Sequence, residues 1–300
     1  MNRRIAILIP CRDEEQTVAG VVTGFARALP HATTFVYDNG SVDNTVERAQ
    51  EAGAVVRTEP ALGKGIVVRR MFADVDADIY VIADGDGTYD PVEAPMLVEQ
   101  LVKDNLDMVV GCRTGLVGRS GHQIGNRAFN ALYRWLFGKG FNDIFSGYRV
   151  FSRRFVKSFP AVSTGFEIET EMSVHASQLR LPASEVDISY GVRPEGSESK
   201  LRTVTDGWRI LKAMGALLKD NRPLQLFGWL ATAFFSAALV LGIPVVVDFA
   251  RTGLVGRLPT AVLASGLMIL SLVQLAVGLI LDSLARGRIE AKRLAYLQAR

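Results

Sequence analysis

Cysteine and histidine are scarce in this chain of 300 residues, which contains two cysteines and three histidines. Cys11 and Cys112 stand far apart, so they form none of the short spacings that bind zinc. A small domain held by disulfides is excluded too, and two thiols fit a reducing compartment. We assign no chemical role to the histidines, which are His31, His122 and His175.

A strong excess of one sign of charge is also missing. The 34 lysines and arginines nearly balance the 31 acidic residues, which leaves a net charge of +3. So modest a charge argues against a nucleic-acid partner. A signal peptide is not indicated either, because Met1 to Arg4 leads straight into a strand-like segment. We therefore expect the N-terminal part to be cytoplasmic.

Long apolar runs are confined to the C-terminal part of the chain. Leu224 to Val247 and Leu258 to Leu281 contain no charged residue. A helix of about 24 residues is roughly 36 Å long, which is enough to cross a bilayer core of about 30 Å. Basic residues are frequent before the first run and after the second, whereas the loop between them has only Arg251 and Arg257. The pattern predicts two membrane spans with both termini in the cytoplasm.

Strand-like and helix-like segments alternate through the first half of the chain. This alternation predicts an α/β domain with a mostly parallel sheet covered by helices. The expected strands are 5–9, 34–37, 54–58, 79–83 and 107–110, and the expected helices are 14–29, 43–52, 65–72, 91–103 and 120–139.

An amphipathic segment, Thr203 to Lys219, precedes the first apolar run. Its position favours an interfacial helix on the bilayer surface, with packing on the globular domain as the alternative. We therefore expect a catalytic domain over 1–200, a juxtamembrane helix over 201–222 and a membrane domain over 223–300, with spans at about 224–247 and 258–281.

Two carboxylates follow the apolar run Ile79 to Ala83, in the triplet Asp84-Gly85-Asp86. The end of a buried parallel strand lies at the sheet edge where α/β folds bind ligands. Carboxylates there suit Mg²⁺ or Mn²⁺ that bridges two phosphates. A solvated turn is the alternative for such a triplet taken alone.

Four further polar segments are predicted at the same edge. They are Pro10 to Glu15, Asp38 to Asp43, Gly63-Lys64-Gly65 and Gly111-Cys112-Arg113. Each follows a predicted strand or opens a predicted helix. Lysine and arginine there could bind phosphate oxygens.

In this order and spacing the segments resemble family 2 glycosyltransferases with the GT-A fold, over about residues 4 to 200. The resemblance implies a Rossmann-like domain that binds a nucleotide sugar, with UDP favoured and GDP-mannose as the alternative. It also implies a divalent ion on Asp86 and Asp84, with Asp86 in a catalytic role. The implied nucleotide-sugar residues are Pro10, Asp13, Glu15, Asp38, Lys64, Asp84 and Asp86. Asn39 stands where many members have a second aspartate, and Gly87 and Thr88 replace a Leu-Gln pair that supplies a metal ligand.

Later motifs narrow the resemblance to polyprenyl-phosphate sugar synthases. The motifs are Gly111 to Arg113, Asn126 to Asn130, Asp143 to Arg149, Phe166 to Met172 and Tyr190 to Lys200. The resemblance implies an inverting transfer to a polyprenyl phosphate at the membrane. We take Arg113 and Asp143 as the catalytic candidates here, with Asp143 as the first choice if a general base acts. The alternative role of Asp143 is to cap the turn around Phe145 and Ser146. The candidate ligands of the acceptor phosphate are Arg113, Arg127, Arg149, Arg193 and Lys200. Relatives in this branch form tetramers, which makes a homo-oligomer one candidate assembly, but the sequence leaves the oligomeric state open.

Two alternatives remain at this point. A processive polysaccharide synthase would carry a Gln-x-x-Arg-Trp motif and a Glu-Asp pair, but Ala131 replaces the glutamine and no Glu-Asp dipeptide occurs. An inactive membrane scaffold that only binds nucleotide is the other alternative. The acidic pair and the basic residues argue against it.

Overall fold

A computed structural model describes residues 3–114, 130–131, 133–135, 137–138, 140–165, 167–191, 215–216, 218–220, 222 and 223–299. The chain divides into two compact units, each treated by itself below. The first comprises Met1–Gly207 together with Lys292–Arg300, and the second comprises Trp208–Ala291.

The described part of the first unit is built on a seven-stranded sheet in the order β3-β2-β1-β4-β6-β5-β7. The strands are β1 (Ile5–Cys11), β2 (Thr33–Asp38), β3 (Val55–Thr58), β4 (Ile79–Ile82), β5 (Met108–Thr114), β6 (Arg149–Ser152) and β7 (Ala183–Ser189). Neighbouring strands are parallel except that β6 runs against both β4 and β5. The predicted α/β fold with a mostly parallel sheet is confirmed, and β6 and β7 are strands that the sequence analysis did not identify.

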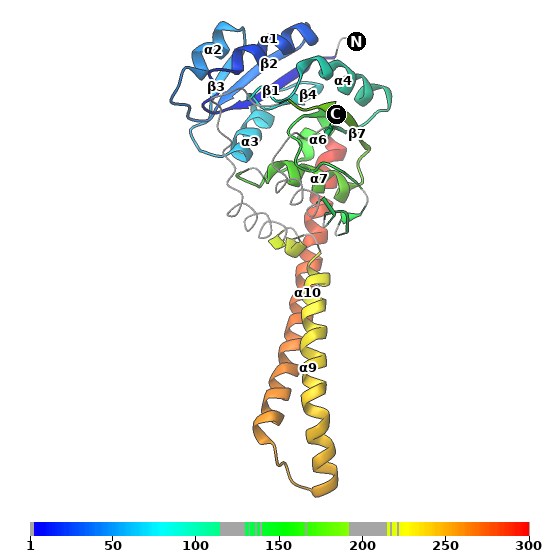
Figure 1. Ribbon diagram of the computed structural model, residues 1–300. Coiled ribbons are helices and arrows are strands. Elements are labelled where there is room, and N and C mark those ends of the chain that lie inside the picture. The colour runs from blue at the N-terminus through cyan, green and yellow to red at the C-terminus, as the bar shows by residue number, and fades with distance from the viewer. Residues whose placement is uncertain are drawn as a thin grey trace. The chain divides into compact units, whose positions relative to one another are not determined.

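Helices cover both faces of this sheet (Figure 1). One face carries α1 (Val18–Ala28), α2 (Thr45–Glu51) and α4 (Ala94–Lys103), the last preceded by a 3₁₀ turn at Pro91–Glu93. The other carries α3 (Lys64–Asp74), α6 (Arg153–Ser158) and α7 (Ile168–Leu179). Apolar strand residues alternate between the two layers, so that Ile7 and Ile9 join the core beneath α1.

The first helix begins later than predicted, at Val18 rather than Glu14. The backbone amides of Glu14 and Glu15 donate to side chains of the next loop, to Thr45 Oγ1 at 2.8 Å and Asp43 Oδ2 at 3.2 Å. These contacts hold the two residues in a loop. The carboxylates of Glu14 and Glu15 therefore precede α1 and do not lie in its first turn.

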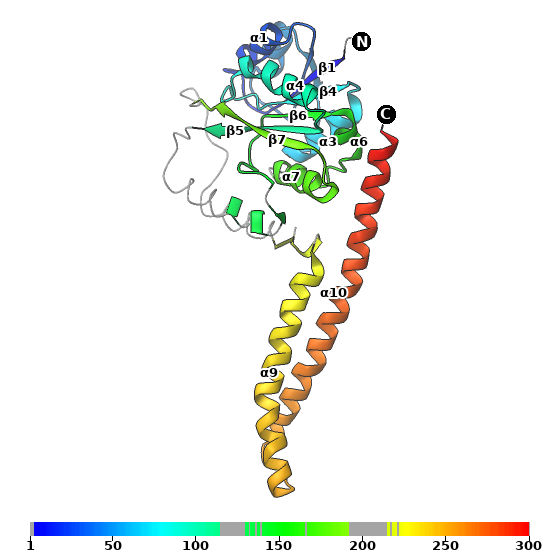
Figure 2. The ribbon, with the colours of Figure 1, turned by 90° about the vertical axis from the view of Figure 1, so that its right-hand side faces the viewer.

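The second unit contains two antiparallel helices that lie side by side (Figures 1 and 2), α9 (Pro223–Thr252) and most of α10 (Leu258–Gln298). Both are long and apolar enough to cross a membrane. Small residues at intervals of seven form the buried stripe of α10 inside this unit: Ala264, Ser271, Gly278 and Ala285. Small side chains let helix backbones approach closely, and Ser271 Oγ donates to the carbonyl of Ala231 on α9 at 2.9 Å.

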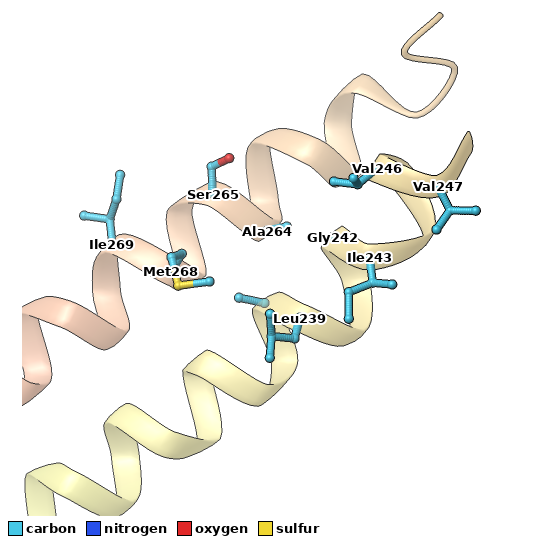
Figure 3. Close-up of a pocket in the computed structure, with 10 residues that line it drawn as sticks. Leu239, Gly242, Ile243, Val246, Val247, Ala264, Ser265, Met268 and Ile269 are labelled. Carbon is cyan, nitrogen blue, oxygen red and sulfur yellow. The ribbon is translucent and has the colours of Figure 1, made fainter. Parts of the chain in front are cut away.

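A groove of about 510 Å³ lies between these two helices (Figure 3). Leu239 and Ile243 line it from α9, and Met268 and Ile269 line it from α10. Its lining residues bear no ionisable group, so the groove offers apolar contact but no acid, base or cation.

Helix α10 extends over Leu258–Gln298, well past the predicted end of the second span. Its last residues belong to the first unit. There the Tyr296 hydroxyl donates to the fully buried Asp107 at 2.8 Å, and the Arg154 guanidinium lies over the Tyr296 ring. The C-terminal segment, which the sequence analysis placed in the membrane domain, therefore packs on the first unit.

A histidine lies in the core between α6 and α7. The ring of His175 packs edge-on against Phe155 and Phe159, and its Nε2 is 3.0 Å from Ser158 Oγ. Burial lowers the pKa of His175 to about 3, with a smaller contribution from the charge of Lys292. The ring is therefore neutral in the folded protein at neutral pH.

This shift predicts that the first unit loses stability as the pH falls below about 6.5. Between pH 6.5 and 3 the unfolded chain binds a proton at His175 that the folded chain does not bind. The free energy of unfolding should therefore fall by about 1.4 kcal/mol per pH unit, or about 2 kcal/mol by pH 5. His175→Gln should lose that much less than the wild type between pH 7 and pH 5. Denaturant titrations in detergent measure this, and equal losses in the two proteins would contradict it.

Candidate active site

Polar loops that adjoin four strands meet at one edge of the sheet. β1, β2 and β4 are parallel and end there, with Cys11 paired to Asp38 in the β1–β2 register. β6 runs in the opposite direction, so the loop before it reaches the same edge. Arg149, its first residue, pairs with Ile82 on β4 and with Val110 on β5. This is the edge at which α/β sheets bind ligands.

The loops after β1 and β2 are joined by their own side chains. The Asp13 amide donates to Ser41 Oγ at 2.9 Å, and Asp13 Oδ1 accepts from the Val42 amide at 2.9 Å. Glu15 Oε2 accepts from the Asn44 amide at 3.1 Å. Two residues predicted to bind the nucleotide therefore also shape the two loops.

Asp38 and Pro10 stand at the ends of the adjacent strands. Asp38 is buried, and its carboxylate accepts from the amides of Gly40 and Ser41, each at 3.2 Å. Pro10 pairs with Tyr37 in the register of β1 with β2. Asp38, the last residue of β2, thus fixes the turn that follows this strand.

Asn39 connects this turn to the segment that carries Lys64. Its Nδ2 donates to the carbonyls of Glu59 at 2.9 Å and Ala61 at 2.8 Å, and its Oδ1 accepts from the Gly63 amide at 2.8 Å. An aspartate could not make the first two contacts, because an ionised carboxylate has no donor. The departure from the family pattern at this position therefore has a structural reason in this chain.

Lys64 lies between two carboxylates. Its Nζ is 2.5 Å from Asp84 Oδ1 and 2.5 Å from Glu169 Oε1. Burial alone would lower the pKa of Lys64, but the charges of Asp84 and Glu169 outweigh burial and raise it. The lysine is therefore firmly cationic, and two residues predicted as nucleotide ligands, Lys64 and Asp84, are in direct contact.

The sequence analysis missed Glu169 as a site residue. Its side chain is 7% exposed and lies in the first turn of α7. The signal was present in the Phe166 to Met172 motif, but a sequence does not reveal which acid of that helix faces the lysine. Phe166 itself lies outside the described residues.

The backbone next to Lys64 is held close to another loop. Gly63 has φ of 139°, and a side chain there would collide with the carbonyl of Thr164. The Gly65 amide donates to the same carbonyl at 3.1 Å. Glycine at position 63 thus permits both the left-handed conformation and the close approach.

Asp86 is almost fully buried at the turn after β4. Its Oδ1 accepts from the Thr88 amide at 3.1 Å and from Thr88 Oγ1 at 2.6 Å. Thr88, which follows Gly87 where family members have the Leu-Gln pair, therefore orients Asp86. Thr17 Oγ1 donates to the Gly85 carbonyl at 2.6 Å and fixes the same turn from α1.

The negative charges of these loops act on the buried thiol of Cys11. Burial raises the pKa of Cys11 well above its ordinary value, and the charges of Glu14, Asp84, Asp38 and Asp86 raise it further. The negative charges of carboxylates from three separate loops thus all raise the pKa of this one thiol. Such a concentration of negative charge is a favourable place for a cation.

Arg113 and Asp143 form a two-pronged ion pair. Arg113 Nε is 2.7 Å from Asp143 Oδ2, and Nη2 is 2.8 Å from Oδ1. The Arg113 guanidinium also lies 5.2 Å from the centre of the Tyr190 ring. Burial alone would raise the pKa of Asp143, but hydrogen bonds and charge from Arg113 outweigh it and lower the pKa. This carboxylate is ionised at neutral pH.

Gly147 lies between the Arg113–Asp143 ion pair and the group formed by Lys64, Asp84 and Glu169, and Tyr89 holds it there. The Gly147 amide donates to the Tyr89 hydroxyl at 2.8 Å. A Cβ atom on Gly147 would lie 2.7 Å from Asp84 Oδ2, so the loop before β6 passes directly against this acid. The loop that carries Asp143 is thereby placed beside the predicted metal ligand.

Arg149 does not have the exposed position that its role as a phosphate ligand requires. Its side chain is almost fully buried and donates to the carbonyls of Ser146 and Ile144. Arg149 is therefore a buried residue of the loop before β6. Three other candidate acceptor ligands, Arg127, Arg193 and Lys200, lie outside the described residues.

The donor set fits a divalent metal shared with a ligand. Within the described part of the chain no group of three or more His, Cys, Asp or Glu side chains could hold a metal alone. Mg²⁺ and Mn²⁺ sites of nucleotide enzymes commonly use one or two carboxylates plus phosphate oxygens. Asp84 and Asp86 supply that number of acids.

Comparison with known proteins decides the family. The model for glycosyl transferase family 2 matches residues 6–158. The glycosyltransferase AglJ of Haloferax volcanii is 35% identical over 251 residues, which is 82% of this chain and 81% of that protein. The chain belongs to glycosyltransferase family 2. It is a family 2 glycosyltransferase that transfers a sugar from a nucleotide sugar.

Two further matches carry names that refer to different phosphorylated compounds. A dolichol-phosphate mannosyltransferase of Pyrococcus furiosus is 26% identical over 223 residues, 67% of this chain and 60% of that protein. The structure of a glucosyl-3-phosphoglycerate synthase of Mycobacterium tuberculosis with Mn²⁺, UDP and glucosyl-3-phosphoglycerate has 24% identity and a TM-score of 0.59. It covers 73% of this chain and 79% of the synthase. The similarity to the synthase structure supports the GT-A fold of this glycosyltransferase.

The contacts of Asn39 predict that Asn39→Asp impairs the nucleotide side of the site. The variant keeps one acceptor but places a carboxylate against the carbonyls of Glu59 and Ala61. We expect a loss of about 2–3 kcal/mol in the free energy of unfolding and weaker nucleotide binding, because the Lys64 segment loses its support. Denaturant titration and calorimetric titration with UDP or GDP and Mn²⁺ measure the two effects.

The matched control is Asn105→Asp, an exposed position outside the site. It should leave nucleotide affinity unchanged and lower the free energy of unfolding by less than about 1 kcal/mol, the effect of one new negative charge at the C-terminal end of α4. Asn39→Asp with the stability and nucleotide affinity of the wild type would show that these hydrogen bonds do not support the site.

Proposed function

We propose that this glycosyltransferase moves its sugar onto the phosphate of a polyprenyl phosphate in the membrane. The observation that carries the proposal is the joining of a family 2 catalytic domain to two helices that are long and apolar enough to span a bilayer. A transferase for a water-soluble acceptor does not need such helices. The relative named dolichol-phosphate mannosyltransferase adds support.

The membrane topology is part of this proposal. Helices α9 and α10 would form a two-span hairpin, with the catalytic domain and both termini in the cytoplasm. The basic residues that flank the apolar runs favour that orientation. The segment 201–222 would lie at the bilayer surface, and a homo-oligomer such as a tetramer is the assembly that we propose.

Asp84 and Asp86 would hold Mg²⁺ or Mn²⁺ together with the diphosphate of the nucleotide sugar. When bound, the ion neutralises the charge that develops on the leaving diphosphate. Pro10, Asp13, Glu15 and Asp38 would bind the nucleoside. UDP-sugars are the favoured donors, with GDP-mannose as the alternative.

The chain's own cations would hold the diphosphate of the donor and the phosphate of the acceptor. Lys64, beside Asp84, would donate to the diphosphate, and Arg113 would bind the acceptor phosphate. Arg127, Arg193 and Lys200 would complete the acceptor site. A site built from arginine and lysine reduces the repulsion between two anionic substrates.

The acceptor needs little help from a base, because a phosphate monoester is already ionised at neutral pH. Its oxygen attacks the anomeric carbon, and the bond from that carbon to the diphosphate oxygen breaks with inversion. The products are a polyprenyl-phosphate sugar and a nucleoside diphosphate. Asp143, which the ion pair keeps ionised, would then act by holding Arg113 toward the acceptor.

The proposal is tested by incubating the full chain in detergent with a panel of UDP- and GDP-sugars, polyprenyl phosphate and Mn²⁺ or Mg²⁺. We expect one donor to give a glycolipid of the predicted mass. Parallel reactions replace the lipid with 3-phosphoglycerate or with unphosphorylated polyprenol. Transfer to 3-phosphoglycerate but not to the lipid would overturn the proposed acceptor, a growing polymer would favour a processive synthase, and nucleotide binding without transfer would favour a scaffold.

Asp86→Asn tests the metal site with an isosteric change. The loss of one metal-binding charge should lower the transfer rate by at least about 100-fold, since metal stabilisation of a leaving group contributes several kcal/mol. The control is Asp104→Asn, an exposed position at the end of α4. Full activity in Asp86→Asn would remove Asp86 from the metal site.

A further inference from the structure

A fully buried arginine stands at the centre of the catalytic edge. Arg149 is 1% exposed and is the first residue of β6, between the ends of β4 and β5. Burial of a guanidinium costs free energy unless its donors are satisfied. Its contacts therefore indicate what this arginine holds in place.

The guanidinium of Arg149 joins two separate segments. Nε donates to the Ser146 carbonyl at 2.8 Å and Nη2 to the Ile144 carbonyl at 2.9 Å, both in the loop before β6. Nη1 donates to Ser173 Oγ on α7 at 3.0 Å and lies 3.7 Å from Met108 Sδ. The planar group thus fixes the spacing between the loop and the helix.

Each of these segments carries the carboxylate that holds one cation of the site. The loop carries Asp143, which pairs with Arg113. Helix α7 carries Glu169, which pairs with Lys64, and Ser173 Oγ donates to the Glu169 carbonyl at 3.2 Å. One buried side chain therefore lies behind both ion pairs.

We propose that Arg149 is a positioning residue that sets the separation of Arg113 and Lys64 through the loop before β6 and α7. The inference rests on the proposed function, in which these cations hold the acceptor phosphate and the nucleotide diphosphate. Two anions must be brought together for in-line attack, so the spacing of their cations affects the rate directly. A displacement of about 1 Å can cost about 100-fold in rate.

The test compares Arg149→Lys with the wild type. Lysine keeps the positive charge, but its single ammonium cannot reproduce three contacts in different directions. We expect kcat per folded molecule to fall about 10- to 100-fold. The dissociation constant for UDP or GDP with Mn²⁺ should rise about 3- to 10-fold, because Lys64 is displaced.

Ser173→Ala is the second variant, and it removes only the contact to α7. It is a small change that should fold, with a kcat decrease of about 3- to 10-fold. Arg70→Lys is the matched control, because Arg70 is an exposed arginine of α3 whose partner is Asp74. It should leave kcat and nucleotide affinity unchanged.

The readouts separate positioning from simple stabilisation. A merely structural role would lower the melting temperature and the yield while kcat per folded molecule and nucleotide affinity stay at wild-type values. That result in both Arg149→Lys and Ser173→Ala would overturn the inference. A loss of kcat and affinity with a melting temperature within about 4 °C of the wild type supports it.

Failure of the proposed function gives a different result. If the wild type uses another phosphorylated acceptor, the lipid proposal fails and the same comparison of kcat is made with that acceptor. If the wild type transfers to no acceptor, the nucleotide affinities of Arg149→Lys and Ser173→Ala decide the inference. Unchanged affinities would then reject it.

Discussion

Pairing of buried charge is the constraint on which this active site depends. Acidic side chains from several loops are at least partly buried at this edge of the sheet, and a buried carboxylate that loses its cationic partner costs free energy. Lys64 is held by Asp84 and Glu169, and Arg113 is held by Asp143. Lys64 thus lies against the predicted metal ligand Asp84, and Arg113 is held by the loop whose Gly147 passes that acid, so the interactions that stabilise the fold also fix the cations of the site.

The reversed strand β6 makes this arrangement possible. In an all-parallel sheet every loop at the catalytic edge would follow a strand. Because β6 is antiparallel, the loop before it enters the same edge and brings Asp143 and Gly147 to Arg113 and Asp84. A family 2 domain thereby gains a loop between its nucleotide side and the side that we assign to the acceptor.

The two apolar helices solve a different physical problem. The stripe of small residues on α10 lets the two helices pack closely. The Ser271 hydroxyl adds a hydrogen bond between the helices by donating to the carbonyl of Ala231 on α9. The described groove between them is apolar. The chemistry and the membrane attachment that we propose therefore fall to different units of the chain, and the proposed lipid acceptor is the substrate that would need both.

The sequence by itself determined the α/β class, the two apolar helices and the acidic triplet at the edge of the sheet. These features follow from local patterns: apolar periodicity, run length and the position of polar residues after strands. Only the tertiary structure decided that Glu169 faces Lys64, that Asn39 supports the Lys64 segment and that Arg149 is buried. Each of these depends on contacts between segments far apart in the chain, and a local pattern does not specify which side chains such contacts bring together.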